Sequence, residues 1–363
     1  MTKPYSIFLL TLILTLASVA CGSATPILTG TLPPAPEPAT VAATTSVSQP
    51  DASPVASPTV AEPGTGATQR VSGPSGLRVL YIREGNLWSW TEASGNVQLT
   101  GTGDMSTARI SYDDQSLAFM RGREVWTVSM DGTDARLLVT QGDAGGALWF
   151  APNGSFLAIS TKDHIDVVDL NTSVSTTVVT YPTLAHAYYP EVVWSPDSFG
   201  FKTAIPPQTE SGQAELLFVF PDGTQASLAK FALVPLTESL PYLSPDGGYL
   251  IYVAKVSDGK ESLYLMDSSG ATKPYGEPAD RVRAYGWLPD SKHFVYGQEN
   301  PARTFLGNVV GPPAEIVLEN YQTIRWVDAE HFLAMQDGDL YLGNMNGGKK
   351  LIDVGVSDFD FKE

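Results

Sequence analysis

Short apolar runs recur along the chain from Leu77 to the C-terminus. Each run is only a few residues long, contains many β-branched and aromatic residues, and is bounded by Gly, Asp, Asn or Pro. This pattern is typical of strands joined by turns. Segments with the 3.6-residue period of an amphipathic helix are absent from this part of the sequence. Residues 77–363 are therefore predicted to form an all-β fold.

One unit of this pattern repeats. It has an aromatic or large apolar residue, a small residue, Pro or Asp, an acidic or amide residue, a second small residue, and then an alternating apolar run. Equivalent positions recur every 37 to 49 residues, the length of one four-stranded propeller blade. Weaker copies begin at Ile110, Trp149 and Trp326. The clearest copies are Trp194-Ser195-Pro196-Asp197-Ser198, Leu243-Ser244-Pro245-Asp246-Gly247 and Trp287-Leu288-Pro289-Asp290-Ser291.

The two ends of the repeat region are predicted to complete one blade together. Residues 77–100 hold three strand-like runs (77–83, 86–91 and 96–100) but lack the strand that opens every other unit. The C-terminal residues 357–361 have the pattern of that missing strand. If they join the first blade, the ring closes and the sheet edges at the chain ends protect each other. We therefore expect a seven-bladed β-propeller of four-stranded antiparallel blades, closed by the C-terminal strand.

The repeated turn resembles that of TolB-type propellers, whose blades carry a Trp/Tyr-Ser-Pro-Asp-Gly turn between their first and second strands. The resemblance covers residues 77–363 and specifies a fold rather than a function. Proline presets a turn dihedral, Asp accepts backbone N–H bonds, and Gly permits a positive φ. One acidic residue per blade is spread around a ring too wide for one catalytic or calcium site. The predicted turn caps are Asp114, Asp197, Asp246, Asp290 and Asp328.

The first 21 residues have the features of a lipoprotein signal peptide. Lys3 precedes an apolar run over residues 7–16, and small residues lead to Cys21, as in secretory signals. Residues 18–22, Ser-Val-Ala-Cys-Gly, resemble the bacterial lipobox, although Ser18 stands where that family usually has Leu. An uncleaved membrane helix is the alternative, but it needs about 20 apolar residues. We expect Cys21 to carry a lipid that holds the protein at the bacterial cell envelope, outside the cytoplasm.

Residues 22–76 are rich in Pro, Thr, Ala and Ser and almost free of aromatic residues. Such a segment buries too little apolar surface to offset the entropy of ordering its backbone. It is predicted to be a disordered tether between the lipid and the propeller.

Charge and cysteine content exclude several functions. The formal charge is −17, which opposes binding to nucleic-acid phosphates and leaves the lipid as the only membrane contact. Cys21 is the single cysteine, so the chain cannot form an internal disulfide or a thiolate metal cluster.

No catalytic motif is found in the sequence, and no cofactor is expected. A propeller enzyme that works at the ring axis would carry convergent His, Asp or Glu on its innermost strands. The predicted innermost strands contain no histidine, and a metal centre needs about three ligands. The four histidines, His164, His186, His293 and His331, lie elsewhere in the repeat. The chain is therefore predicted not to be an enzyme and to hold no metal.

Two sets of residues are candidates for ligand binding on the face formed by the inter-blade loops. One long loop, residues 181–190, carries His186, Tyr188 and Tyr189, and aromatic residues of this kind often anchor protein contacts. Arg281 and Arg283 stand out in an acidic chain and are predicted to hold a carboxylate. The alternative is that the tyrosines cover a blade edge and the arginines pair with local acids.

The leading interpretation is a monomeric binding or scaffolding propeller whose partner is an envelope protein, a peptide or a glycan. The alternative is a hydrolase or lyase that acts on extracellular polysaccharide at the ring axis. A pair of carboxylates about 5–10 Å apart would favour the alternative.

Overall fold

The computed structural model describes residues 71–130, 133–141, 145–183, 188–207, 212–234, 239–299, 302–316, 318–319 and 321–362. Cys21, most of the predicted tether and His186 lie outside these residues. Apart from the 3₁₀ turn η1 (Ser257–Gly259), the regular elements of the described ranges are all strands. Nowhere in these ranges is a helix long and apolar enough to cross a membrane.

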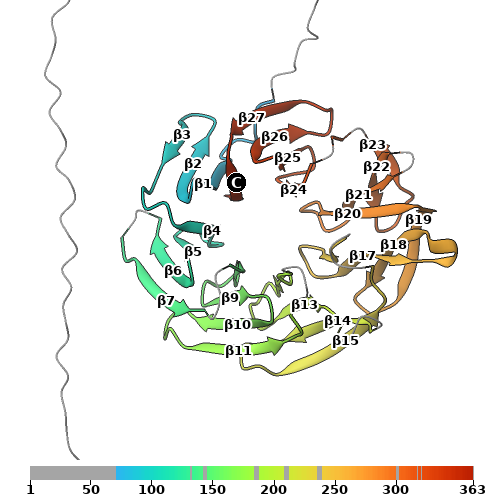
Figure 1. Cartoon of the computed structure of the whole chain (residues 1–363), viewed down its shortest axis with the longest axis horizontal. Coiled ribbons are helices and arrows are strands. Elements are labelled where there is room, and N and C mark those ends of the chain that lie inside the picture. Colours follow the sequence, from blue (N-terminus) through green and yellow to red (C-terminus); the bar gives the residue numbers. More distant parts are fainter. Residues whose placement is uncertain are drawn as a thin grey trace, which may run out of the picture. The chain divides into compact units, whose positions relative to one another are not determined.

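The strands form seven four-stranded antiparallel sheets around a ring (Figure 1). From the axis outward, blade 1 contains β28 (Val356–Lys362), β1 (Arg78–Arg83), β2 (Asn86–Thr91) and β3 (Gly95–Gln98). Blade 2 contains β4 (Met105–Ile110), β5 (Ser116–Arg121), β6 (Glu124–Ser129) and β7 (Arg136–Thr140). Blade 3 contains β8 (Ala147–Phe150), β9 (Phe156–Ser160), β10 (His164–Asp169) and β11 (Ser175–Thr180).

The remaining four blades follow the same order. Blade 4 contains β12 (Val193–Trp194), β13 (Phe201–Ile205), β14 (Ala214–Val219) and β15 (Gln225–Phe231). Blade 5 contains β16 (Tyr242–Leu243), β17 (Tyr249–Lys255), β18 (Glu261–Asp267) and β19 (Thr272–Ala279). Blade 6 contains β20 (Arg281–Trp287), β21 (His293–Glu299), β22 (Arg303–Asn308) and β23 (Ala314–Ile316). Blade 7 contains β24 (Thr323–Trp326), β25 (His331–Gln336), β26 (Asp339–Asn344) and β27 (Lys349–Asp353).

The predicted closure of the ring is confirmed. Strand β28 pairs antiparallel with β1, from Arg78 opposite Lys362 to Arg83 opposite Val356. Phe359, in the middle of β28, is buried. Blade 1 therefore joins segments from opposite ends of the repeat region, and β1 is covered by β28 rather than left as an open sheet edge.

The hydrophobic core lies between neighbouring blades. Ile165 of blade 3 packs in one cluster with Phe201 and Leu217 of blade 4. The cluster between blades 7 and 1 includes Leu340 and Tyr81, and Val71, within the predicted tether segment, is buried in it. Because each blade buries its faces against two neighbours, the stability of every blade depends on the ring.

The repeated turns are capped as predicted, with one correction. Carboxylates of Asp197, Asp246, Asp290 and Asp328 each accept a backbone N–H two residues further on. In blade 2 this role belongs to Asp113, which accepts the N–H of Gln115. The prediction for Asp114 is wrong, because that residue has a positive φ of 59° and occupies the position of the turn glycine.

Tryptophans of the motif connect adjacent blades. The indole N–H of Trp194 donates to the carbonyl of Trp149, and that of Trp287 donates to the carbonyl of Tyr242. Trp326 is the equivalent residue of blade 7, but its buried indole nitrogen has no hydrogen-bond partner in the part of the chain that the structure describes. The indole hydrogen bond between blades is therefore not formed where blade 7 meets blade 6, although Trp326 is buried in the core between them.

Candidate functional site

The inner strand of blade 6 has an irregular backbone. Strand β20 has seven residues, whereas β12 and β16 have two each. Its pairing with β21 shifts register between Ala284 and Gly286, and Gly286 has a φ of 110°. Such a β-bulge redirects the side chains beside it. Here Tyr285 is the extra residue, without a partner in the β20–β21 register.

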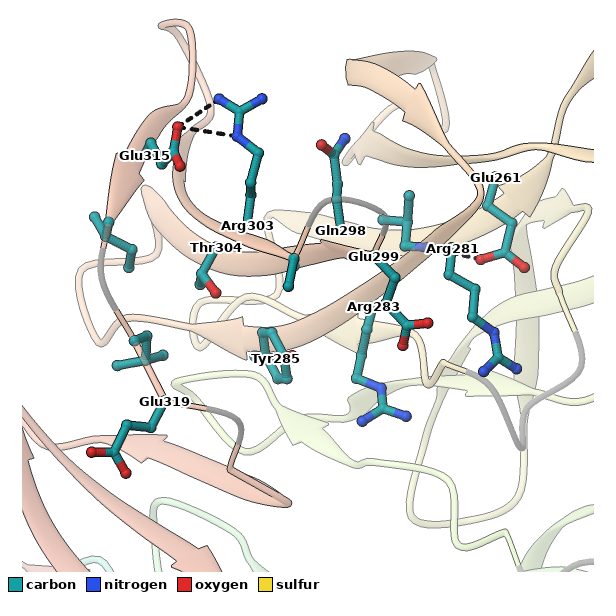
Figure 2. Close-up of a pocket in the computed structure, with 15 residues that line it drawn as sticks. Glu261, Arg281, Arg283, Tyr285, Gln298, Glu299, Arg303, Thr304, Glu315 and Glu319 are labelled. Atoms are coloured by element: carbon teal, nitrogen blue, oxygen red, sulfur yellow. Dashed lines mark hydrogen bonds and ion pairs between the residues drawn. The ribbon is translucent and has the colours of Figure 1, made fainter.

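A pocket of about 570 Å³ lies beside this strand (Figure 2). Arg281, Arg283 and Tyr285 alternate along β20 and so share one face of it. Its walls also come from β21, β22, β23 and the segment that leads to blade 7. The lining residues are Glu261, Arg281, Val282, Arg283, Tyr285, Gly297, Gln298, Glu299, Ala302, Arg303, Thr304, Glu315, Ile316, Leu318 and Glu319.

Three of the four pocket glutamates already have partners. Glu315 forms an ion pair with Arg303 at 2.5 Å, and in Figure 2 this pair lies away from Arg281 and Arg283. Glu319 forms an ion pair with Lys349 at 2.5 Å. Buried Glu261 accepts the backbone N–H of Val282 at 2.9 Å. These acids are therefore committed to the fold.

Arg283 differs from these residues. Its side chain is exposed, and its guanidinium makes no hydrogen bond or ion pair with any residue that the structure describes. Glu299, also exposed, has no such partner within the same part of the chain. Arg281 stands directly opposite Glu299 in the β20–β21 pairing. The pocket therefore contains one arginine, Arg283, and one glutamate, Glu299, whose charges are not paired with any described residue.

Tyr285 depends on the absence of a side chain at position 297. A methyl group added to Gly297 would lie only 2.9 Å from Cε2 of Tyr285 and 3.1 Å from its hydroxyl oxygen. Gly297 is paired with Arg283 across the two strands. The glycine thus leaves room for the aromatic ring next to the guanidinium.

Ionisable residues also surround the ring axis near this pocket. Burial raises the pKa of Glu191 to about 7, although the hydrogen bond from the Leu243 N–H and the positive charge of Arg325 oppose the shift. Burial and the negative charge of Glu191 raise the pKa of Tyr242 to about 12, while Arg283 lowers it. Burial and the nearby Arg109 lower the pKa of Arg325. Arg283 therefore stands where the pocket meets the polar axis.

Two carboxylates of β28, Asp358 and Asp360, serve the closure of the ring. Asp358 pairs with Arg109 at 2.6 Å and accepts the N–H of Ala108, while Asp360 accepts the N–H of Ile110 and lies 3.4 Å from Arg325. Two positions apart on β28, these acids are spaced by about 7 Å, within the range of a glycosidase pair. Both are engaged with arginines and backbone, so the hydrolase or lyase alternative is not favoured.

The structure places the other predicted residues differently. Tyr188 is only 7% exposed, and its hydroxyl donates to the carbonyl of Ala204, so it packs inside the blade. Tyr189 is half-buried and is the accessible member of the pair.

The described histidines form local hydrogen bonds. His293 and His331 contact the turn carboxylates of Asp290 and Asp328, and His164 contacts Asp163. In the described ranges no group of three His, Cys, Asp or Glu side chains is arranged to hold a metal ion.

Sequence reasoning found the arginines of the pocket but missed several of its other residues. The period of two along a strand would have added Tyr285 to Arg281 and Arg283. Glu299 and Gly297 could not be predicted in this way, because their positions depend on the register of β21 against a bulged β20.

Comparison with solved structures shows the propeller fold. The chain is similar to the tricorn protease (TM-score 0.55, 12% identity, covering 78% of this chain and 34% of that one) and to a prolyl endopeptidase (TM-score 0.50, 14% identity, covering 70% and 43%). It is also similar to TolB from Acinetobacter baumannii (TM-score 0.45, 13% identity, covering 78% and 66%). The chain thus spans less than two thirds of each of these proteins. No protein-family model and no curated protein matches the sequence. Fold and site together define a seven-bladed β-propeller with a mixed-charge pocket on blade 6.

Proposed function

We propose that this chain is a binding propeller that docks a protein or peptide partner at the pocket of blade 6. The observation that carries the proposal is Arg283, an exposed guanidinium without a hydrogen-bond or ion-pair partner among the described residues, set in a pocket of about 570 Å³. A pocket of this volume suits a small ligand or a short piece of chain. A guanidinium is the side chain best suited to bidentate recognition of a carboxylate.

Chemistry on a substrate is not supported at this pocket. Its charged residues are arginines and glutamates, and Glu261, Glu315 and Glu319 are held by hydrogen bonds or ion pairs. A general acid or base needs a group that is available to the substrate and poised to exchange a proton. Among the pocket glutamates only Glu299 is uncommitted. Recognition is therefore favoured over catalysis.

The binding proposal is tested with purified full-length protein and an array of short peptides of mixed sequence. A subset of peptides is expected to bind, and Arg283→Gln is expected to weaken that binding at least tenfold. Arg78→Gln is the matched control, because Arg78 lies at the start of β1 in blade 1, outside the pocket. Failure of every peptide to bind, or equal binding by Arg283→Gln, would refute a peptide-binding role for this pocket.

The proposal includes anchorage at the bacterial envelope through a lipid on Cys21. It is supported by the lipobox-like residues before Cys21 and by the Pro- and Thr-rich segment that follows. Metabolic labelling with a palmitate analogue should mark the parent protein and not Cys21→Ala. Label that persists in the variant would contradict anchorage at this residue.

A further inference from the structure

The charge pattern and walls of the blade 6 pocket point to a narrower class of ligand. Resting on the proposed peptide-binding function, we infer that the pocket selects a single carboxylate carried next to an aliphatic side chain. The carboxylate pairs with Arg283, and the aliphatic group contacts Ile316 and Leu318. The shared chemistry can come from a free peptide C-terminus or from an internal Asp or Glu.

The preference for a ligand with a single negative charge follows from the charges around the Arg283 guanidinium. Glu299 is exposed in the pocket lining and has no ion-pair partner among the described residues, so further negative charges on the ligand meet like charge. The whole chain carries a formal charge of −17, which repels polyanions before they reach the pocket. A polyuronic acid, a polyphosphate or a nucleic acid is thereby disfavoured. A ligand with one carboxylate gains the contact with Arg283 and avoids this repulsion.

The preference for an aliphatic group next to the ligand carboxylate follows from the apolar residues in the pocket wall opposite β20. Ile316 ends β23, and Leu318 follows it towards blade 7; both side chains are half-buried and pack against the core between blades 6 and 7. Apolar surface that is already partly enclosed gains from being covered by an aliphatic group. A hydroxyl-rich sugar ring does not benefit from this wall to the same extent. The observations therefore favour a peptide over an acidic sugar.

Tyr285 and Gly297 define the space for the carboxylate. The Tyr285 ring lies over Gly297, whose backbone is paired with that of Arg283. A larger residue at position 297 must shift the Tyr285 ring and so change the shape of the pocket beside Arg283. Gly297→Ala is therefore expected to reduce binding without any change in charge, which separates the shape of the pocket from its electrostatics.

The test uses full-length protein and four short peptides of one length. The first ends in a free Leu carboxylate, and the second is its C-terminal amide. The third is an amide with an internal Asp next to Leu, and the fourth is the same amide with Asn in place of Asp. Titration at low salt should show binding of the first or the third peptide at least tenfold tighter than its uncharged counterpart. A difference between the first two peptides would identify the carboxylate as a free C-terminus. A difference between the last two would identify it as an internal Asp. Replacement of Leu by Ser in the tighter peptide should weaken its binding.

Two variants complete the design. Arg283→Gln should remove the preference for the charged peptide while its affinity for the amide stays unchanged, and Arg78→Gln should retain the preference. Equal binding of charged and uncharged peptides, with both still sensitive to Gly297→Ala, would overturn the carboxylate inference and leave the peptide-binding function standing. Absence of binding by all four peptides, together with tight binding of a free uronic acid, would overturn the inference in favour of a glycan ligand. Absence of all binding would overturn both.

Discussion

The seam that closes the ring and the pocket of blade 6 use the same residue types for different ends. At the seam, Arg109 and Asp358 are 2.6 Å apart with side chains 14% and 19% exposed, and the carboxylate also accepts a backbone N–H of β4. In the pocket, Arg283 is exposed and has no ion-pair partner among the described residues. The charges at the seam are paired with each other within the fold. The charge of Arg283 in the pocket remains available to a ligand. Pairing, rather than residue type, separates a structural arginine from a candidate binding arginine.

Removal of β28 should have the largest effect. Truncation after Gly355 takes away the inner strand of blade 1 with buried Val356 and Phe359, and should cost about 5 kcal/mol or more of unfolding free energy, a scale set by the loss of large buried side chains. Denaturant unfolding measures this loss. Truncation after Phe361 is the control, because it leaves the buried part of the strand in place. Equal midpoints for the parent and the longer deletion would contradict closure by this strand.

Disruption of one seam pair should have the next largest effect. Asp358→Asn leaves the mostly buried Arg109 without its carboxylate, and should cost about 3 kcal/mol. Asp104→Asn is the matched control, since the Arg121–Asp104 pair is 42% exposed on both sides, and exposed pairs contribute about 1 kcal/mol or less. Comparable losses in the two variants, measured by denaturant unfolding, would show that the seam pair has no special structural weight.

Ionisation of Glu191, near the ring axis, should make the free energy of unfolding depend on pH. Its pKa is raised by burial from 4.5 to about 7, so the folded protein favours the protonated form. The contribution of this protonated carboxyl to the free energy of unfolding is complete below pH 4.5 and is lost as the pH rises through 7. Glu191→Gln keeps an acceptor for the Leu243 N–H but cannot ionise. The variant should match the parent at pH 4.5 and exceed its stability at pH 8 by on the order of 2 kcal/mol. A constant difference between the two proteins across this range would show that Glu191 is ionised without penalty.

Arg283 should have the smallest effect on stability. Its exposed guanidinium contributes no hydrogen bond or ion pair within the described part of the chain, so Arg283→Gln should change the unfolding free energy by about 0.5 kcal/mol or less. The same denaturant unfolding measurement, applied to Asp358→Asn, gives the contrast. A loss similar to that of the seam variant would mean that Arg283 is structural, and would remove the main support for a binding site on blade 6.

Local pattern determined the fold of residues 77–363. The period of two, the repeated turn and the unpaired C-terminal run were enough to predict seven blades and their closure, because each is visible in a short stretch of sequence. The turn aspartates were predicted for the same reason, since a side chain that caps a backbone N–H two residues away acts locally. Arg281 and Arg283 were identified as unusual cations in an acidic chain, and both line the pocket.

The tertiary structure alone decided which residues are committed to packing. Tyr188 is buried and its hydroxyl donates to the Ala204 carbonyl, a contact that no pattern along the chain encodes. Arg109 finds Asp358 across 249 positions of sequence, and the register that sets Gly297 opposite Arg283 is defined by a bulge. A sequence specifies which side of a strand a residue faces through its alternation. Whether that residue is then paired, buried or left open to a ligand depends on distances between blades, which are set only when the ring closes.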